Sequence, residues 1–245
     1  MKIYDKTRYD FLLSFTAMFL ILIFVSIYFA TYSLKEYAGV LTDDNIAKEK
    51  NDVTVILDAG HGGMDPGAIG SGDVYEKDLN LMLTFELRDI LSSMNINTVL
   101  TRSDDRLLFT DEEDIKGKRK MYDLINRCKI AAKYKDGIFV SIHMNKFAQS
   151  QYRGLIVYYS DNREESYKLA NDIQNNIKEN LQSNNNRKVK NGSDSVYLLK
   201  NMNIPAILIE CGFLSNEEEL KDLCDAEYRK KIATLIAISI AENIE

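Results

Sequence analysis

VTVILDAGHGGMDPGAIG, residues 53–70, joins a short β-branched run to a glycine-rich turn. The run 53–58 is almost continuously apolar and ends just before Gly60, which is typical of a buried central strand. Five further runs share this character, and together they predict a six-stranded sheet. They are residues 97–101, 137–143, 155–159, 195–199 and 206–210.

Helical stretches alternate with these strands. In residues 163–182, the side chains of Leu169, Ile173, Ile177 and Leu181 recur every four residues and place an apolar stripe on one helix face. Such alternation favours a largely parallel sheet covered on both faces. We therefore predict a single α/β domain over residues 52–245, with three αβα layers and a mostly parallel, twisted six-stranded sheet. The other expected helices are residues 77–94, 116–134 and 226–243, and the Asn-rich stretch 180–192 is expected to be a solvated connector.

The composition is that of an ordinary globular protein, with 45% hydrophobic and 28% charged residues. The net charge of −6 argues against nucleic acid as a partner, because binding phosphates needs a basic surface. The three cysteines, Cys128, Cys211 and Cys224, form no Cys-x-x-Cys pair, so we expect neither a disulfide framework nor a thiolate zinc site. We expect all three to be small buried residues.

Residues 11–32 form an uncharged run long enough to cross a bilayer as a helix. The basic segment 1–10 precedes this run, and the positive-inside rule places that segment in the cytoplasm and the domain outside. A cleaved signal peptide is the alternative, although the run is longer than the apolar core of most signal peptides. Residues 33–51 are expected to be a polar linker. The domain is thus expected to be exported, either anchored to the membrane through residues 11–32 or secreted.

Chemically versatile residues follow three of the expected strands. His61 and His143, the two histidines of the sequence, come after the first and third strands, and Glu210 closes the last. Ligands of open α/β sheets bind beyond the carboxyl ends of the strands. These three side chains can therefore converge on one site.

Two histidines and one carboxylate commonly hold a catalytic zinc ion and leave a fourth position open. The sequence offers four carboxylates near His61. Glu76 begins an expected helix, which is a more rigid mount than the preceding loop. Spacing alone favours Glu76 but leaves the others open. The candidates are Asp65, Asp73, Glu76 and Asp78.

Glu210 is a candidate general base. A carboxylate at the end of a central strand, partly desolvated beside a cation, can take a proton from water and pass it to a leaving nitrogen. The structural alternative is a carboxylate that caps a turn or pairs with an arginine.

Four motifs follow one another along the chain. They are Ile56-Leu-Asp-Ala-Gly-His61-Gly-Gly, Glu76 followed by Asn80, Ser141-Ile-His143-Met-Asn145 and Ile209-Glu210-Cys-Gly-Phe-Leu-Ser-Asn216. In this order they resemble the zinc-dependent N-acetylmuramoyl-L-alanine amidases, and the resemblance extends from Val53 to the C-terminus. More narrowly, Ala59, the N-terminal hydrophobic segment and the stretches 185–187 and 197–200 are similar to the spore-cortex branch of this family.

The resemblance implies that His61, Glu76 and His143 bind one Zn²⁺ and that Glu210 is the catalytic carboxylate. It implies hydrolysis of the amide between N-acetylmuramic acid and L-alanine in peptidoglycan. For the spore-cortex branch the resemblance implies that the amidase acts upstream of a muramic acid deacetylase. The two enzymes together form muramic-δ-lactam, which germination hydrolases recognise. This step would take place in the intermembrane space around the developing spore.

Four more polar residues are candidates for supporting roles. Arg127 matches an arginine common in the family and would contact substrate carboxylates, brace the site or form a structural ion pair. Asp58 would orient a ligand imidazole or cap the end of its strand. Asn145 and Asn216 are candidate substrate contacts.

Two other functions compete with the amidase. A zinc carboxypeptidase also uses two His and one Glu, but its His-x-x-Glu motif needs Glu where this chain has Met64. A non-catalytic, metal-binding wall or scaffold protein is disfavoured, because candidates stand at all four site positions. For the amidase we expect dependence on an accessory activator protein in the same extracytoplasmic compartment, since the sequence shows neither an inhibitory insertion nor a wall-binding module.

Overall fold

The computed structural model describes residues 16, 23–29, 31 and 53–244. The chain divides into two units, Met1–Glu49 and Lys50–Glu245. In the first unit the described residues are helical, and nowhere in the described part of the chain is a helix long and apolar enough to span a bilayer. The basic segment 1–10, the linker 33–51 and most of the run 11–32 lie outside the described residues, so their assignments stay predictions.

In the second unit, six strands form one sheet in the order β2-β1-β3-β6-β4-β5. The pairs β1–β2, β1–β3, β3–β6 and β4–β5 are parallel, and β4 runs antiparallel to β6. The mostly parallel six-stranded sheet is therefore confirmed. The strands are β1 Thr54–Ala59, β2 Asn97–Leu100, β3 Ile138–Asn145, β4 Ile156–Tyr159, β5 Lys190–Asn191 and β6 Ala206–Phe213.

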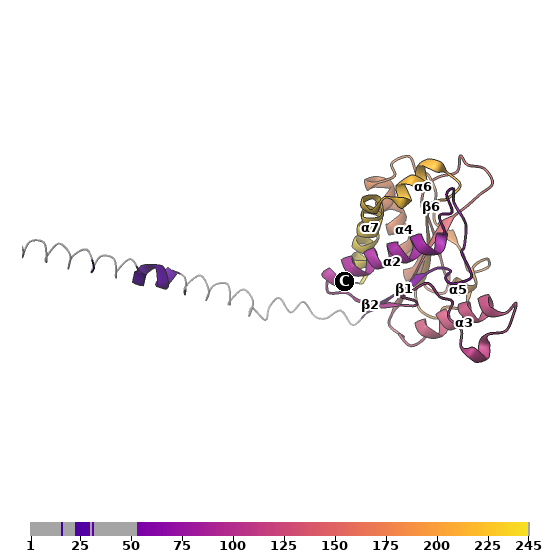
Figure 1. Ribbon diagram of the computed structural model, residues 1–245, viewed down its shortest axis with the longest axis horizontal. Coiled ribbons are helices and arrows are strands. Elements are labelled where there is room, and N and C mark those ends of the chain that lie inside the picture. Colours follow the sequence, from indigo (N-terminus) through magenta and orange to yellow (C-terminus); the bar gives the residue numbers. More distant parts are fainter. Residues whose placement is uncertain (1–15, 17–22, 30, 32–52, 245) are drawn as a thin grey trace, which may run out of the picture. The chain divides into compact units, whose positions relative to one another are not determined.

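Helices cover both faces of the sheet and give three layers (Figure 1). One face carries α2, α4 and α7, whose apolar stripes pack on alternate strand residues such as Val55 and Leu57. The intervening residue Ile56 points to the opposite face, where it packs with α3 and α5. The helices are α2 Glu76–Ser93, α3 Arg119–Ala131, α4 Glu164–Asn180, α5 Tyr197–Asn201, α6 Glu217–Cys224 and α7 Ala226–Ile244, with a 3-10 helix η2 at Asp111–Glu113.

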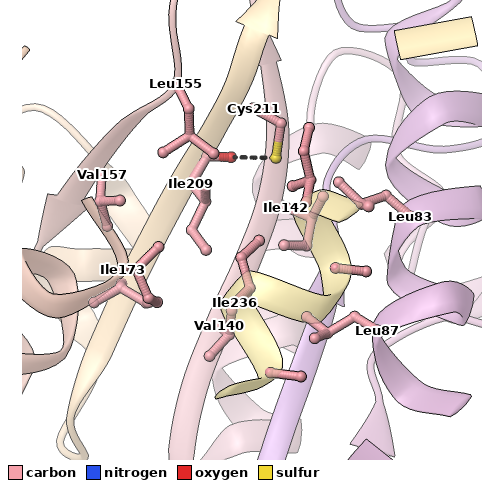
Figure 2. Close-up of a cluster of buried hydrophobic side chains, with 14 of the residues drawn as sticks. Leu83, Leu87, Val140, Ile142, Leu155, Val157, Ile173, Ile209, Cys211 and Ile236 are labelled. Carbon is pink, nitrogen blue, oxygen red and sulfur yellow. Dashed lines mark hydrogen bonds between the residues drawn. The ribbon is translucent and has the colours of Figure 1, made fainter. Parts of the chain in front are cut away.

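The larger core lies between the sheet and the α2, α4 and α7 layer. Figure 2 shows Leu83 and Leu87 of α2 and Ile236 of α7 facing Val140 and Ile142 of β3. All of these side chains are fully buried. Burying each one stabilises the fold by about 1.5–3 kcal/mol relative to leaving it exposed. This packing fixes the strands whose carboxyl ends carry the site.

Two expectations about local structure are wrong. Residues 195–199 are predicted as a strand, but Ser195 and Val196 lie in a turn where both donate to the carbonyl of Gly192, and helix α5 begins at Tyr197. A short apolar run suits a buried helix as well as a strand, and here packing against β6 decides. Among the cysteines, Cys211 is buried, but Cys128 is half-buried and Cys224 is exposed.

Candidate metal centre and active site

His61 leaves the end of β1 in a left-handed backbone conformation, with φ of 62°. Two buried arginines hold this turn. Arg102 donates to the carbonyls of Ala59 at 2.8 Å and Gly60 at 3.0 Å, and Arg127 donates to Ala59 at 2.7 Å and His61 at 2.7 Å. Three successive carbonyls are thus bound by guanidinium groups. These bonds offset the cost of the unusual backbone and fix where the His61 side chain begins.

His61, Glu76 and His143 come together at the carboxyl end of the sheet. Glu76 Oε1 lies 3.1 Å from His61 Nε2 and 3.0 Å from His143 Nδ1. The imidazole rings are 4.9 Å apart between centroids and cross at 76°. One donor atom from each of the three residues lies within 4.8 Å of the other two.

Glu76 is aimed by its surroundings. Its Oε1 also accepts from the backbone N–H of Met144 at 3.0 Å, and its Oε2 accepts from the N–H of Ala68 at 2.7 Å. Asn80, one helical turn further along α2, bridges Glu76 Oε1 and the carbonyl of Gly60. Hydrogen bonds to both carboxylate oxygens therefore fix the orientation of the Glu76 side chain toward the two imidazoles.

Asp65 contacts the other side of His61. Its Oδ2 lies 2.9 Å from His61 Nδ1, and its Oδ1 pairs with Lys120 at 2.5 Å. A carboxylate on Nδ1 fixes the tautomer and turns Nε2 toward Glu76, as metal-bound histidines usually require. Of the remaining carboxylate candidates in the described chain, Asp73 is exposed in a turn and Asp78 lies in the first turn of α2, and neither contacts an imidazole.

The charges of this cluster are strongly coupled. Burial lowers the pKa of His61, but hydrogen bonds to Asp65 and Glu76 outweigh burial and raise that pKa to about 9. Burial likewise opposes ionisation of Glu76, yet hydrogen bonds from both imidazoles hold its pKa well below the usual range. The site therefore stabilises positive charge between its carboxylates, which is the property that a cation-binding site needs.

Glu210 lies beside this cluster. In the pairing of β3 with β6, Glu210 stands directly opposite His143. Its Oε2 is buried and has no hydrogen-bond partner among the described residues. Burial raises the pKa of Glu210 to about 7, with the negative charge of Glu76 adding to the effect and the two histidines opposing it. A carboxylate with such a pKa can both accept and release a proton near neutral pH.

Two glycines leave room for the imidazoles. A Cβ at Gly60 would lie 2.2 Å from Cε1 of His143, and a Cβ at Gly67 would lie 2.7 Å from Cδ2 of His61. Gly67 also has a positive φ of 67°, which glycine adopts without strain. The glycine-rich turn after β1 thus shapes the space around the candidate ligands.

The contacts of the supporting residues can be compared with what was expected of them. Arg127 is only 1% exposed, and its guanidinium is engaged by Asp58, Asp123 and backbone carbonyls, which are the contacts that the expected bracing role or structural ion pair would need. Asp58 accepts from Thr101, Arg127 and Ser141, and the imidazole contact expected of it is made by Asp65.

The two asparagines also have different places. Asn216 caps α6, with its side chain bonded to the N–H of Glu219 and the carbonyl of Ser150, and its contact with a substrate stays a prediction. Asn145 is half-buried at the end of β3, two residues after His143, and its role stays a prediction. Sequence reasoning missed the positioning of Asp65 and Arg102. The His61-to-Asp65 spacing of four residues across two glycines was the available signal for the first.

The donor set suits a divalent metal. Two imidazoles and one carboxylate match the ligands of catalytic zinc sites, and the three donor atoms are close enough for one ion to join them. An open α/β sheet with this cluster and a desolvated carboxylate at its carboxyl edge defines a hydrolase with a candidate metal centre.

Comparison with known proteins identifies which hydrolase family this is. The Amidase_3 family, described as N-acetylmuramoyl-L-alanine amidase, matches residues 55–242, and the chain belongs to this family. The germination-specific N-acetylmuramoyl-L-alanine amidase of Bacillus subtilis is 35% identical over 74% of this chain and 76% of that protein. Membership favours an amidase acting on peptidoglycan over a carboxypeptidase or a non-catalytic wall protein.

Solved structures agree with this assignment. The CwlD amidase from Clostridioides difficile, in complex with the GerS lipoprotein, is 44% identical with a TM-score of 0.74, covering 78% of this chain and 98% of that one. The amidase AmiC2 of Nostoc punctiforme is 31% identical with a TM-score of 0.66, covering 78% and 96%. The fold and the family agree with the expectation from the four motifs.

Proposed function

We propose that this chain is a zinc-dependent amidase that hydrolyses the bond between N-acetylmuramic acid and L-alanine during maturation of the spore cortex. The observation that carries the proposal is the cluster of His61, Glu76 and His143 beside a desolvated Glu210. One Zn²⁺ would be held by the three clustered residues. When bound there, zinc would polarise the scissile carbonyl and make water a stronger acid.

The protein's own groups account for the proton movements. Glu210 accepts a proton from the attacking water and delivers it to the departing alanine nitrogen, which its raised pKa of about 7 suits. Asp65 keeps the proton of His61 on Nδ1, so that Nε2 is free to act as a ligand. The N–H groups of Met144 and Ala68 keep the Glu76 carboxylate in place through the reaction.

Two relatives support the spore-cortex role. One is named for germination, and the other is the CwlD amidase, which is 44% identical to this chain. On this proposal the chain removes the peptide from muramic acid, and a muramic acid deacetylase then acts on the product to form muramic-δ-lactam. Peptidoglycan lies outside the cytoplasm, so we place the enzyme in the intermembrane space around the developing spore, held by residues 11–32 or secreted.

An accessory protein is part of the proposal. The solved CwlD amidase is in complex with the GerS lipoprotein. We infer that this chain also works with an accessory activator, expected to be a lipoprotein in the same compartment.

The test uses the full chain with zinc on cortex-type peptidoglycan, with the candidate lipoprotein present and absent. Mass spectrometry should detect released peptides with a free N-terminal alanine, and a chelator should abolish them until zinc is added back. Release of peptides shortened from the carboxyl end instead would support a carboxypeptidase. No release under any of these conditions, despite bound zinc, would contradict the proposal.

A further inference from the structure

Three aromatic rings and an arginine gather at the same edge of the sheet as Glu210. Because β4 runs antiparallel to β6 and β5 runs parallel to β4, the segments leading into β4 and β5 lie at the carboxyl end of β6. Phe147 and Tyr152 precede β4, Arg187 precedes β5, and Phe213 ends β6 three residues after Glu210. The topology alone therefore brings this group to the site.

The three rings pack against one another, two pairs edge to face and the Tyr152–Phe213 pair stacked. Phe213 is fully buried, whereas Phe147 is 44% and Tyr152 is 41% exposed. The ring centroids of Phe147 and Tyr152 are 5.3 Å apart, and they lie 5.3 Å and 6.3 Å from that of Phe213. Two adjacent large aromatic side chains are thus kept at the surface beside the catalytic strand.

Arg187 lies against this aromatic cluster, and no carboxylate of residues 53–244 forms an ion pair with it. Its guanidinium carbon is 4.6 Å from the centre of the Phe213 ring and 6.0 Å from that of Tyr152. Its Nε donates to the carbonyl of Arg153 at 2.8 Å, and within residues 53–244 its terminal nitrogens have neither a hydrogen bond nor an ion pair. Arg153, by contrast, pairs with Glu218 at 3.1 Å.

This geometry makes the Arg187 guanidinium a preorganised binding site for an anion. A guanidinium stacked on a ring face keeps its edge free, and that edge matches the two oxygens of a carboxylate. The stacking on Phe213 and the bond to Arg153 hold the side chain in one orientation, so little freedom is lost when a ligand binds.

We propose that Arg187 binds a carboxylate on the stem peptide of the substrate, with Phe147 and Tyr152 packing against the aliphatic part of the same peptide. The inference rests on the proposed function, because it names the part of the amidase substrate, the stem peptide, that these three residues would contact. Phe213, on which Arg187 lies, follows Glu210 by three residues, and three residues of a strand span roughly 10 Å. A substrate peptide bound in an extended form would cover the same distance with about three residues. The carboxylate that Arg187 binds would therefore lie two or three residues beyond the scissile amide.

The test compares two synthetic substrates. One is an N-acetylmuramoyl tripeptide of L-alanine, D-glutamate and a diamino acid with its carboxylates free, and the other has every carboxylate amidated. The full zinc-loaded chain should show a kcat/KM about 10- to 100-fold higher for the free acid than for the amidated peptide. The difference should come from a lower KM for the free acid, with kcat unchanged. Arg187→Gln should abolish this preference while cleaving the amidated peptide as well as the unmodified protein does.

Two further variants separate recognition from folding. Arg153→Gln removes a neighbouring positive charge that Glu218 already engages, and it should keep the preference. Arg187→Lys keeps the positive charge but cannot bond both carboxylate oxygens as a guanidinium does, so it should keep only part of the preference for the free acid. A preference that survives in Arg187→Gln, or an equal loss on both substrates, would overturn the proposal and assign Arg187 to the fold or to a protein partner.

The outcome is separable from that of the proposed function. If the unmodified chain cleaves neither peptide, with the candidate lipoprotein present or absent, the amidase proposal fails, and calorimetric binding of the same two peptides still tests Arg187. Tighter binding of the free acid by the unmodified chain than by Arg187→Gln would then support the carboxylate subsite. Equal binding would overturn it.

Discussion

His143 and Glu210 stand directly opposite each other on the adjacent parallel strands β3 and β6. Neighbouring strands are about 4.8 Å apart, so the candidate ligand and the candidate base are held by one rigid ladder of hydrogen bonds. Glu76 reaches the same point from helix α2, and His61 reaches it from the turn after β1. The chemistry is therefore mounted mainly on regular structure, which keeps its geometry precise.

Glu210→Gln should lower kcat by about 10²- to 10⁴-fold, because it removes the group that carries the proton. Zinc content, measured by mass spectrometry of the purified protein, should stay at one equivalent. Glu217→Gln, an exposed neighbour at the start of α6, is the matched control and should leave both unchanged. Loss of zinc from Glu210→Gln would show that Glu210 is a ligand instead.

Asp65→Asn should weaken zinc affinity by about 10- to 100-fold, because the amide no longer fixes the His61 tautomer. His61→Ala and His143→Ala should lose the ion outright. Competition with a chromophoric chelator measures these affinities. Asp73→Asn, at an exposed turn nearby, should bind zinc normally. Equal affinities for Asp65→Asn and the unmodified protein would contradict the role of Asp65.

Gly60→Ala should displace the His143 ring, since the added Cβ would lie 2.2 Å from Cε1 and 2.3 Å from Nε2 of that ring. We expect zinc affinity and activity to fall together. Gly72→Ala is a suitable control, because no atom lies within 4 Å of its Cβ, although its φ of 71° adds backbone strain. The control should cost about 1 kcal/mol of stability and no zinc affinity. Normal zinc binding by Gly60→Ala would count against the placement of His143.

Asp58→Asn should destabilise the fold by about 3–5 kcal/mol, because it leaves the buried Arg127 short of one charge partner. Burial raises the pKa of Asp58, but Arg127 and the hydroxyls of Ser141 and Thr101 lower it by more than burial raises it. The pKa of Asp58 therefore lies below its ordinary value. A depressed pKa contributes stability that is present above the unfolded-state pKa and is lost as pH falls through the folded-state value.

Urea unfolding at several pH values measures this contribution. The stability gap between the unmodified protein and Asp58→Asn should be full at pH 7 and should narrow below about pH 4. Asp89→Asn, which breaks an exposed pair with Arg88, should change stability by less than about 0.5 kcal/mol. A gap that does not change with pH would mean that the ionisation of Asp58 contributes nothing.

Much of the fold could be predicted from the sequence. The apolar runs at 53–58, 137–143 and 206–210 became β1, β3 and β6, and the four-residue stripe around Ile173 became α4. Since β1, β3 and β6 are parallel, the convergence of His61, His143 and Glu210 could be predicted from strand ends alone.

Other features depend on tertiary contacts that leave little trace in the sequence. The last three residues of the run 195–199 begin helix α5, where Leu198 and Leu199 pack against Ala206 and Leu208 of β6, and no local pattern specifies this packing. The stretch 180–192, expected to be a solvated connector, has Asn185 buried against the carbonyl of Leu155 and Arg187 stacked on Phe213. Asp65 reaches His61 because Gly62 and Asp65 bridge the turn through their backbones.

The most direct test of the central claim is a zinc-edge anomalous difference map from crystals of this protein grown with zinc. We predict a single strong peak bonded to His61 Nε2, Glu76 and His143 at about 2.0–2.2 Å, with Glu210 outside bonding distance. A peak at another place, or one that takes Glu210 as a ligand, would contradict the assignment of three ligands and a separate base.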